Sequence, residues 1–119
     1  MEKYTIQRSP FVVPTHDGKY IAEHFGNASI AAPMSIARMI APPHWAEPFQ
    51  QPEFDEYTLI LKGKKQFKFI DETVVLTAGE SIKITKGTPI QYSNPFDEEV
   101  EYISVCMPAF SVDTVHRLL

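Results

Sequence analysis

The stretch from His44 to Gly63 (HWAEPFQQPEFDEYTLILKG) gathers the side chains best suited to chemistry in this chain. A histidine, a tryptophan, two glutamines and four acidic residues stand there ahead of an apolar run. Imidazole and carboxylate groups transfer protons or bind metals, and amides bind polar ligands. Glu56 directly precedes the apolar run, so a strand would hold its carboxylate in place. We therefore expect the functional site in this stretch.

Length, charge and cysteine content restrict the class of protein. The chain has 119 residues, which fits one small domain, residues 1–119, with a single core. Its net charge of −4 argues against a nucleic-acid partner, because a phosphate-binding surface needs basic residues. The only cysteine, Cys106, excludes an internal disulfide, and we expect it to be a buried, inert thiol.

The hydropathy pattern bears on location. No apolar run approaches the roughly 18–20 residues that span a bilayer, so no membrane partner is expected. The sequence MEKYTIQRSP at the N-terminus is too polar for a secretory signal. We expect a cytoplasmic protein.

Short β-prone runs separated by proline and glycine turns predict an all-β sandwich or barrel. Pro10 and Pro14 flank the first run, so residues 1–28 are predicted to form N-terminal edge strands. Residues 29–108 are predicted to form the barrel core. The predicted strands after the first run are 20–25, 29–41, 57–61, 66–70, 74–76, 82–84, 90–93 and 102–107.

Two segments, residues 29–41 and 111–119, contain signals for a helix. Residues 29–41 also fit a helix, since Ala, Met and Arg are good helix formers, but prolines at both ends favour a strand. In the tail, residues 111–119, Ser111 is a suitable N-cap and Asp113 suits a first helical turn. The tail is predicted to form a short helical turn that packs on the barrel or on a partner.

Two spacings resemble the motifs of the cupin superfamily. Glu56, six residues and then Gly63 resemble the end of the first motif, where two histidines one residue apart precede the glutamate. The spacing of Gly79, Gly87 and Asn94 resembles the second motif. The resemblance implies a small antiparallel jelly-roll barrel with a pocket in its mouth. Cupins that bear degenerate motifs of this kind are often described as mannose-6-phosphate-isomerase-like or conserved-barrel proteins.

The chain departs from these motifs at the metal ligands. The family's metal site uses the two first-motif histidines, the glutamate and a second-motif histidine. Here the histidine positions fall on Phe49 and Gln51, or on Gln50 and Pro52, and the last falls on Ile90. A divalent metal needs about three protein ligands. We therefore expect neither the usual metal site nor another cofactor; the alternative is a divalent metal in a non-standard site.

Strand alternation after the motif glutamate orients the candidate site. If Glu56 points into the barrel, Thr58 and Ile60 do too, and the residues facing outward are Tyr57, Leu59 and Leu61. A buried carboxylate needs a partner. Arg38 is the candidate, either as a structural ion pair or as a group that grips a ligand carboxylate or phosphate.

Other candidates surround this position. His44, in the loop at the predicted barrel mouth, is either an acid–base residue, a substitute metal ligand or an exposed loop histidine. Trp45 beside it is expected to be a lid or packing residue, with sugar stacking as the alternative. Gln51 would hydrogen-bond a polar ligand, and Tyr92 would offer a hydroxyl on the same wall as Ile90.

A basic run follows the candidate strand. Its members are expected to form a solvated hairpin face rather than a nucleic-acid surface. They are Lys62, Lys64, Lys65 and Lys68.

These residues leave three functions open. The first is a cupin-like barrel that binds a small polar or sugar-like molecule without the usual metal; it predicts Gln51, Glu56 and Tyr92 around one cavity. The second is an isomerase, epimerase or lyase acting on a sugar or keto acid, with Glu56 and His44 as the acid–base pair. The third is a non-catalytic regulatory module that works as a homodimer. Whether the chain is an enzyme stays open at this point.

Overall fold

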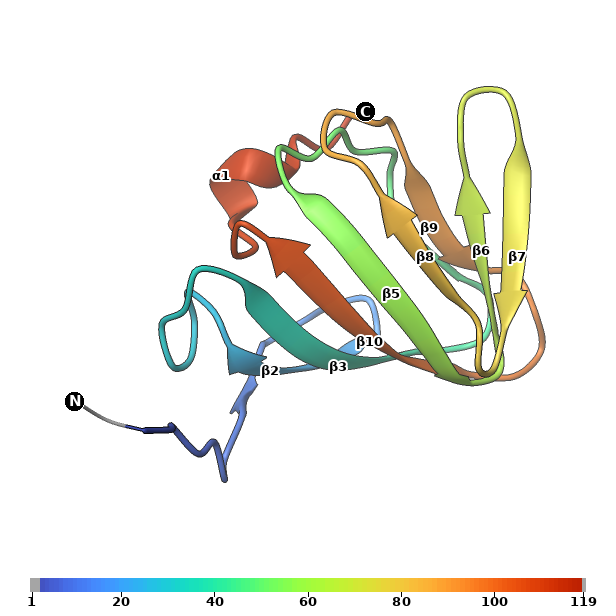
Figure 1. The fold of residues 1–119 in the computed structure, drawn as a ribbon. Helices are drawn as coiled ribbons and strands as arrows, with labels where there is room; N and C mark the ends of the chain where they lie inside the picture. The colour runs from blue at the N-terminus through green and yellow to red at the C-terminus, as the bar shows by residue number, and fades with distance from the viewer. Residues whose placement is uncertain (1–2, 119) are drawn as a thin grey trace.

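Two antiparallel sheets enclose the core of the computed structural model, which describes residues 3–118 (Figure 1). The fold is an all-β jelly-roll barrel with one short C-terminal helix, as predicted. The elements are β1 Phe11–Val12, β2 Tyr20–Phe25, β3 Ser35–Ala41, β4 Trp45–Ala46, β5 Asp55–Lys62, β6 Lys64–Lys68, β7 Thr73–Thr77, β8 Ser81–Ile84, β9 Gln91–Asn94, β10 Val100–Met107 and α1 Val112–Val115.

The strand order explains how segments far apart in sequence meet. The larger sheet has the order β1-β2-β3-β10-β5-β8, and the smaller has the order β4-β9-β6-β7. β10 lies between β3 and β5 and pairs with both along most of its length. β1, between two prolines, is the short edge strand that the sequence predicts.

The segment that also fits a helix is a strand. Within residues 29–41, β3 occupies Ser35–Ala41 and hydrogen-bonds β2 on one side and β10 on the other. Pairing on both sides satisfies its backbone groups, which outweighs the helix propensity of its residues.

Alternation along β5 has the predicted facing. Glu56, Thr58 and Ile60 are buried, whereas the exposed side chains of this strand include Tyr57, Leu59 and Leu61. One face of β5 therefore forms part of the barrel interior and the other the outer surface.

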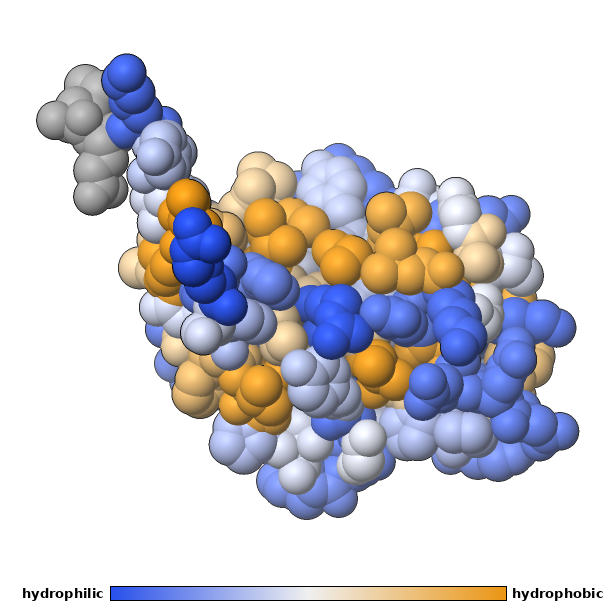
Figure 2. All heavy atoms as spheres, turned by 90° about the horizontal axis from the view of Figure 1, so that it is seen from below, coloured by the Kyte–Doolittle hydropathy of each residue, from blue (hydrophilic) through white to orange (hydrophobic). Residues whose placement is uncertain are grey.

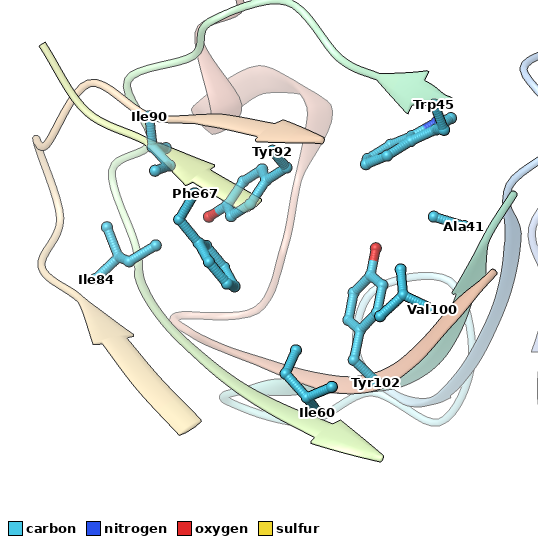
Figure 3. Packing of buried hydrophobic residues seen from close by; sticks show 9 residues of the cluster. All are labelled: Ala41, Trp45, Ile60, Phe67, Ile84, Ile90, Tyr92, Val100 and Tyr102. Carbon is cyan, nitrogen blue, oxygen red and sulfur yellow. The ribbon is translucent and has the colours of Figure 1, made fainter. Parts of the chain in front are cut away.

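The largest hydrophobic cluster lies between the two sheets (Figure 3). Two of its aromatic members, Phe67 and Tyr92, pack edge to face with their ring centres 5.8 Å apart. The cluster consists of Ala41, Trp45, Ile60, Phe67, Ile84, Ile90, Tyr92, Val100 and Tyr102.

Gly63 makes the turn between β5 and β6 possible. Its φ is +82°, and a Cβ there would lie 2.5 Å from the Glu99 carbonyl oxygen. Only glycine has both the backbone freedom and the small size that this turn requires. The clash with Glu99 therefore explains why the motif has a glycine at the turn after β5.

The C-terminal tail packs on the barrel. Ser111 caps α1 by accepting a hydrogen bond from the Asp113 amide, as the sequence predicts. After the helix the tail runs beside residues 49–53, where the Gln51 amide donates to the His116 carbonyl oxygen at 3.0 Å. Val115 is buried in a second small cluster with Phe54, Cys106 and Phe110. In Figure 1 this tail crosses the upper end of the barrel.

Within residues 3–118, no helix has the length and hydropathy needed to cross a membrane.

Candidate functional site

A cavity of about 110 Å³ lies inside the barrel at the end where β10 finishes and β5 begins. The inward side chains of β3 and β10 form one wall, and side chains from β6 and β9 and from the segment after β4 form the opposite wall. Charged and amide groups are numerous in this lining. They include Lys19, Glu23, Glu47, Gln50, Glu56 and Lys65.

Two hydroxyl groups hold the Glu56 carboxylate. The Tyr92 hydroxyl donates to Glu56 Oε1 at 2.6 Å, and the Ser104 hydroxyl donates to Glu56 Oε2. All three residues are more than nine-tenths buried. Burial, together with the Glu56 charge, raises the pKa of Tyr92 well above its ordinary value, so the phenol remains a donor. A carboxylate has about four lone-pair positions, so these two bonds leave it free to accept more.

Lys65 projects from β6 into the same cavity and is only 2% exposed. Its Nζ atom lies 3.6 Å from the ring centre of Tyr102 and 4.4 Å from that of Tyr92. No hydrogen bond or ion pair of this amine occurs within residues 3–118. Burial, with a further effect of the Lys19 charge, lowers the pKa of Lys65 to about 7.

Lys19 is a second buried amine with the opposite behaviour. Its Nζ atom lies 3.8 Å from Glu47 Oε2 and 4.8 Å from the Trp45 ring centre. Burial acts to lower the pKa of Lys19, but Tyr102 and the carboxylates of Glu47 and Glu56 outweigh it and raise the pKa above its ordinary value. The barrel therefore contains one paired, charged lysine and one unpaired lysine.

The remaining polar lining comes from the loop after β4 and from the tail. Gln50 is buried, and its amide donates to Glu47 Oε1 at 3.5 Å. Arg117 in the tail approaches Glu47 Oε2 at 3.9 Å and reaches the cavity wall. Glu23 is bonded elsewhere, since its carboxylate accepts from the Ala28 amide and the Ser29 hydroxyl at 2.8 Å each.

The prediction that Arg38 pairs with Glu56 is wrong. Arg38 Nη1 donates to Glu101 Oε2 at 2.8 Å, and both side chains are partly exposed. Ala37 and Met39 on the same strand line the cavity, so alternation turns Arg38 to the outer face. It grips no ligand in the barrel.

The prediction that His44 and Glu56 converge is also wrong. His44 lies beyond the end of β3, where Ala41 pairs with Val100, whereas Glu56 pairs with Cys106. Those positions on β10 are separated by about 20 Å of strand, at about 3.3 Å per residue. His44 is 65% exposed and its Nε2 lies 2.9 Å from Asp97 Oδ1. The exposed loop histidine is the alternative that fits.

Gln51 and Trp45 also lie outside the cavity lining. Gln51 is exposed and donates to the Gly87 carbonyl oxygen at 3.0 Å. Its neighbour Gln50 points inward, so the inward glutamine is one residue earlier than predicted. Trp45 is buried in the hydrophobic cluster and its indole donates to Asp17 Oδ2 at 2.8 Å, which makes it a packing residue.

Three further candidates are buried as predicted, but they take different positions. Thr58 is 1% exposed, and its hydroxyl has no partner within residues 3–118, but it does not reach the cavity. Ile90 is fully buried in the hydrophobic cluster. Cys106 lines the cavity, and burial together with the Glu56 charge raises the pKa of its thiol well above the ordinary range.

The match to a known family covers more than half of the chain. The family described as "Cupin domain" matches residues 37–106, which run from β3 to β10 and include Glu56 with its two partners Tyr92 and Ser104. The chain belongs to the cupin family. The matched residues make up most of the barrel, from β3 to β10.

Solved structures support the same fold. The polyketide cyclase RemF from Streptomyces resistomycificus has a TM-score of 0.77 at 14% identity, covering 100% of this cupin and 87% of that chain. An RmlC-like cupin from Shewanella frigidimarina has a TM-score of 0.72 at 12% identity, covering 92% and 93%. At these identities the likeness extends to the fold alone.

A curated relative is closer in sequence. A protein named endoribonuclease YbeY from Myxococcus xanthus is 38% identical over 106 residues, which are 88% of this cupin and 36% of that protein. The chain thus spans about a third of the length of the relative it matches.

The residues at the cupin metal positions do not fit a divalent metal. Of the positions that the motif spacings give for the histidines, Gln50 lines the cavity and Ile90 is buried in the hydrophobic cluster, and the amine of Lys65 shares the cavity with the Glu56 carboxylate. Within residues 3–118, no group of three or more His, Cys, Asp or Glu side chains is placed to hold a metal ion.

Two residues of this site were missed for a recognisable reason. The run from Lys62 to Lys68 was predicted to be solvated, but Lys65 is two residues before Phe67 and shares its inward face. The same alternation places Ser104 on the inward face with Tyr102. Applying the period of two to every residue of a strand, including charged ones, would have found both.

Proposed function

We propose that this cupin binds a small polar molecule in its barrel, with no metal ion taking part. The observation that carries the proposal is the pairing of an unfilled cavity with buried, converging polar groups, namely the Glu56 carboxylate and the Lys65 amine. Buried charged groups destabilise a fold unless they are paired or hydrogen-bonded, whether to the protein or to a ligand. An acceptor and a potential donor facing one cavity are what a small-molecule site needs.

The size of the cavity limits the ligand. About 110 Å³ is smaller than the roughly 150 Å³ engineered cavity that accepts benzene. A molecule of about four to six non-hydrogen atoms would therefore fit, and a complete hexose would not. This favours small acids and carbonyl compounds over the sugar-like ligands that the sequence left open.

A thermal-shift screen tests this proposal. Acetate, glycolate and lactate are the small ligands, glucose is the size control, and the protein is purified without chelators so that its metal content is measured on the same sample. We expect at least one small acid to raise the melting temperature by mass action, and glucose to leave it unchanged. Tyr92→Phe should lose the shift, because the Glu56 carboxylate then lacks the hydrogen bond that holds it in position. Tyr57→Phe, on the outer face, should keep the shift.

Two results would contradict the proposal. One is a stoichiometric metal whose removal abolishes binding. The other is a set of small acids and carbonyl compounds that fail to stabilise the wild-type protein at any concentration. The endoribonuclease activity in the name of the M. xanthus relative does not enter the proposal, because the chain matches 36% of that protein.

A homodimer is a second proposal, carried by the outer face of the larger sheet. Tyr57, Leu59 and Leu61 are each about 40% exposed on β5, beside Ile103 and Val105 on β10. Of the charges nearby, Arg38 bonds Glu101, and Lys83 lies over the Tyr57 ring at 5.8 Å. An apolar face of this kind suits a second copy related by twofold symmetry.

Figure 2 shows a mixed surface, in which groups of hydrophobic side chains are separated by a row of hydrophilic ones. Such a surface is typical of interfaces between proteins that also exist separately. Analytical ultracentrifugation should show a concentration-dependent dimer that Leu59→Glu abolishes and Val75→Glu, on the other sheet, does not. A monomer at all micromolar concentrations would contradict this proposal.

A further inference from the structure

We propose that Lys65 acts as a nucleophilic amine that forms an imine with a small aldehyde, ketone or 2-oxo acid held in the cavity. This inference rests on the proposed function, because it assigns a ligand class to the same cavity.

The placement of Lys65 carries the argument. The side chain is 2% exposed and lines the cavity, and its Nζ atom lies among the rings of Phe67, Tyr92 and Tyr102 at 5.2, 4.4 and 3.6 Å from their centres. Within residues 3–118 no carboxylate lies within 4 Å of it. An amine that is desolvated and free of a counter-ion is the usual form of an imine-forming lysine.

The contrast with Lys19 separates structure from chemistry. Lys19 has Glu47 at 3.8 Å and remains charged, so its role is that of an internal counter-ion. Lys65 has no such partner, and the positive charge of Lys19 further disfavours a second ammonium group in the barrel. A substantial fraction of Lys65 is therefore a free amine near neutral pH, when its lone pair is available for attack.

The step balances without a further reactant. The Lys65 nitrogen attacks the carbonyl carbon and forms a C–N bond, giving a carbinolamine. The carbon–oxygen bond then breaks, both amine protons leave with the oxygen as water, and a C=N bond remains. The charged groups that share the cavity with this amine and lie close enough to affect its pKa are Lys19, Glu47 and Glu56.

Size and polarity agree with this ligand class. Glyoxylate and pyruvate have five and six non-hydrogen atoms and so match a cavity that accepts about four to six. Within the lining, Glu56 accepts hydrogen bonds while Lys19 and Arg117 supply positive charge for a carboxylate. A small 2-oxo acid brings a carboxylate for those cations, and the hydroxyl of the carbinolamine formed from it can donate to Glu56.

Reductive trapping tests the inference. The full chain is incubated with glyoxylate or pyruvate and cyanoborohydride at pH 7, and the adducts are located by intact mass and peptide mapping. We expect one dominant adduct on Lys65, forming at least about tenfold faster than on any exposed lysine, because a lysine in water is almost entirely protonated at pH 7. Lys65→Arg and Lys65→Met should abolish it, and Lys68→Met should not.

The outcomes separate the two proposals. Adducts spread over exposed lysines with none on Lys65 overturn the imine. If lactate and glycolate still stabilise the protein in that case, the binding proposal stands and the covalent step alone is wrong. If neither hydroxy acids nor oxo acids stabilise it and no Lys65 adduct forms, both proposals fail. Circular dichroism of Lys65→Arg, which keeps a cation of similar length, verifies that loss of trapping is not loss of folding.

Discussion

The two halves of β10 face the same interior and yet have different chemistry. Val100 and Tyr102, near its start, are fully buried in the hydrophobic cluster. Ser104 and Cys106, near its end, line the cavity. β5 changes in the same direction, from Ile60 in the cluster to the Glu56 carboxylate.

The difference shows how a chain this small holds buried charges. The packed half is the hydrophobic cluster around Trp45, Phe67 and Tyr102, and Tyr92 stands at its border with the cavity. Burying apolar area is the main source of stability. Strands fixed by that packing extend into the hollow half and hold its polar groups in position. The packed half is thus the source of stability, and the hollow half is the place where ligand chemistry is possible.

Removing an aromatic residue from the packed half should have the largest effect. Phe67→Ala leaves a cavity at a fully buried position and should lower the free energy of unfolding by about 3–5 kcal/mol. Urea denaturation measures it. A loss under about 1 kcal/mol would mean that the packed half does not stabilise the barrel.

A substitution in the cavity wall should lower the free energy of unfolding less than Phe67→Ala does, and should weaken ligand binding more. Tyr92→Phe removes the hydroxyl that bonds Glu56 at 2.6 Å and keeps the ring that packs on Phe67. We expect a loss of about 1–3 kcal/mol, because a buried acceptor loses one partner. Urea denaturation measures this loss, and Tyr57→Phe, on the outer face, should show none.

The pH dependence of stability should single out Lys65. Its pKa is about 7 in the folded protein and ordinarily 10.5, so between these values the unfolded chain binds a proton that the folded chain does not. As pH rises from about 7 to about 10.5, this group should therefore add up to about 1.4 kcal/mol per pH unit to the free energy of unfolding of the wild-type protein. Below pH 7 the amine is protonated in both states, so it should make no pH-dependent contribution there. Denaturation at several pH values should show that Lys65→Met lacks this gain. Parallel curves for the two proteins would show that the amine is not desolvated.

The smallest effect should come from the outer face. Arg38→Gln breaks an ion pair with Glu101 that is about one-third exposed, and should change stability by less than about 1 kcal/mol. Ligand-induced thermal shifts should be unchanged, because Arg38 lies outside the cavity. A loss of ligand binding in this variant would mean that the two faces of the sheet are coupled.

Sequence patterns predicted the strands well because their signals are local. Alternation along β5 and the cap at Ser111 depend on neighbouring residues, and the structure has both. The resemblance to the two cupin motifs also predicted that strands far apart in sequence lie close together in the barrel. Glu56 and Tyr92 were placed in one cavity for this reason.

Loops and pairings were harder because they depend on contacts far apart in sequence. The path of the proline-rich segment decides that Gln50 rather than Gln51 points inward, and its hydrogen bonds to the tail fix that path. The position of His44 depends on which end of the barrel the loop leaves. Lys65 was misplaced by its charge, since buried lysines are rare.

The tail beside residues 49–53 closes part of the cavity wall. Arg117 belongs to a wall held by a few backbone hydrogen bonds, among them Glu53 amide to Thr114 carbonyl at 2.9 Å, rather than by a sheet. Segments of this kind open locally at far lower free energy than the whole fold. Local opening of the tail would therefore expose the cavity while the two sheets stay intact.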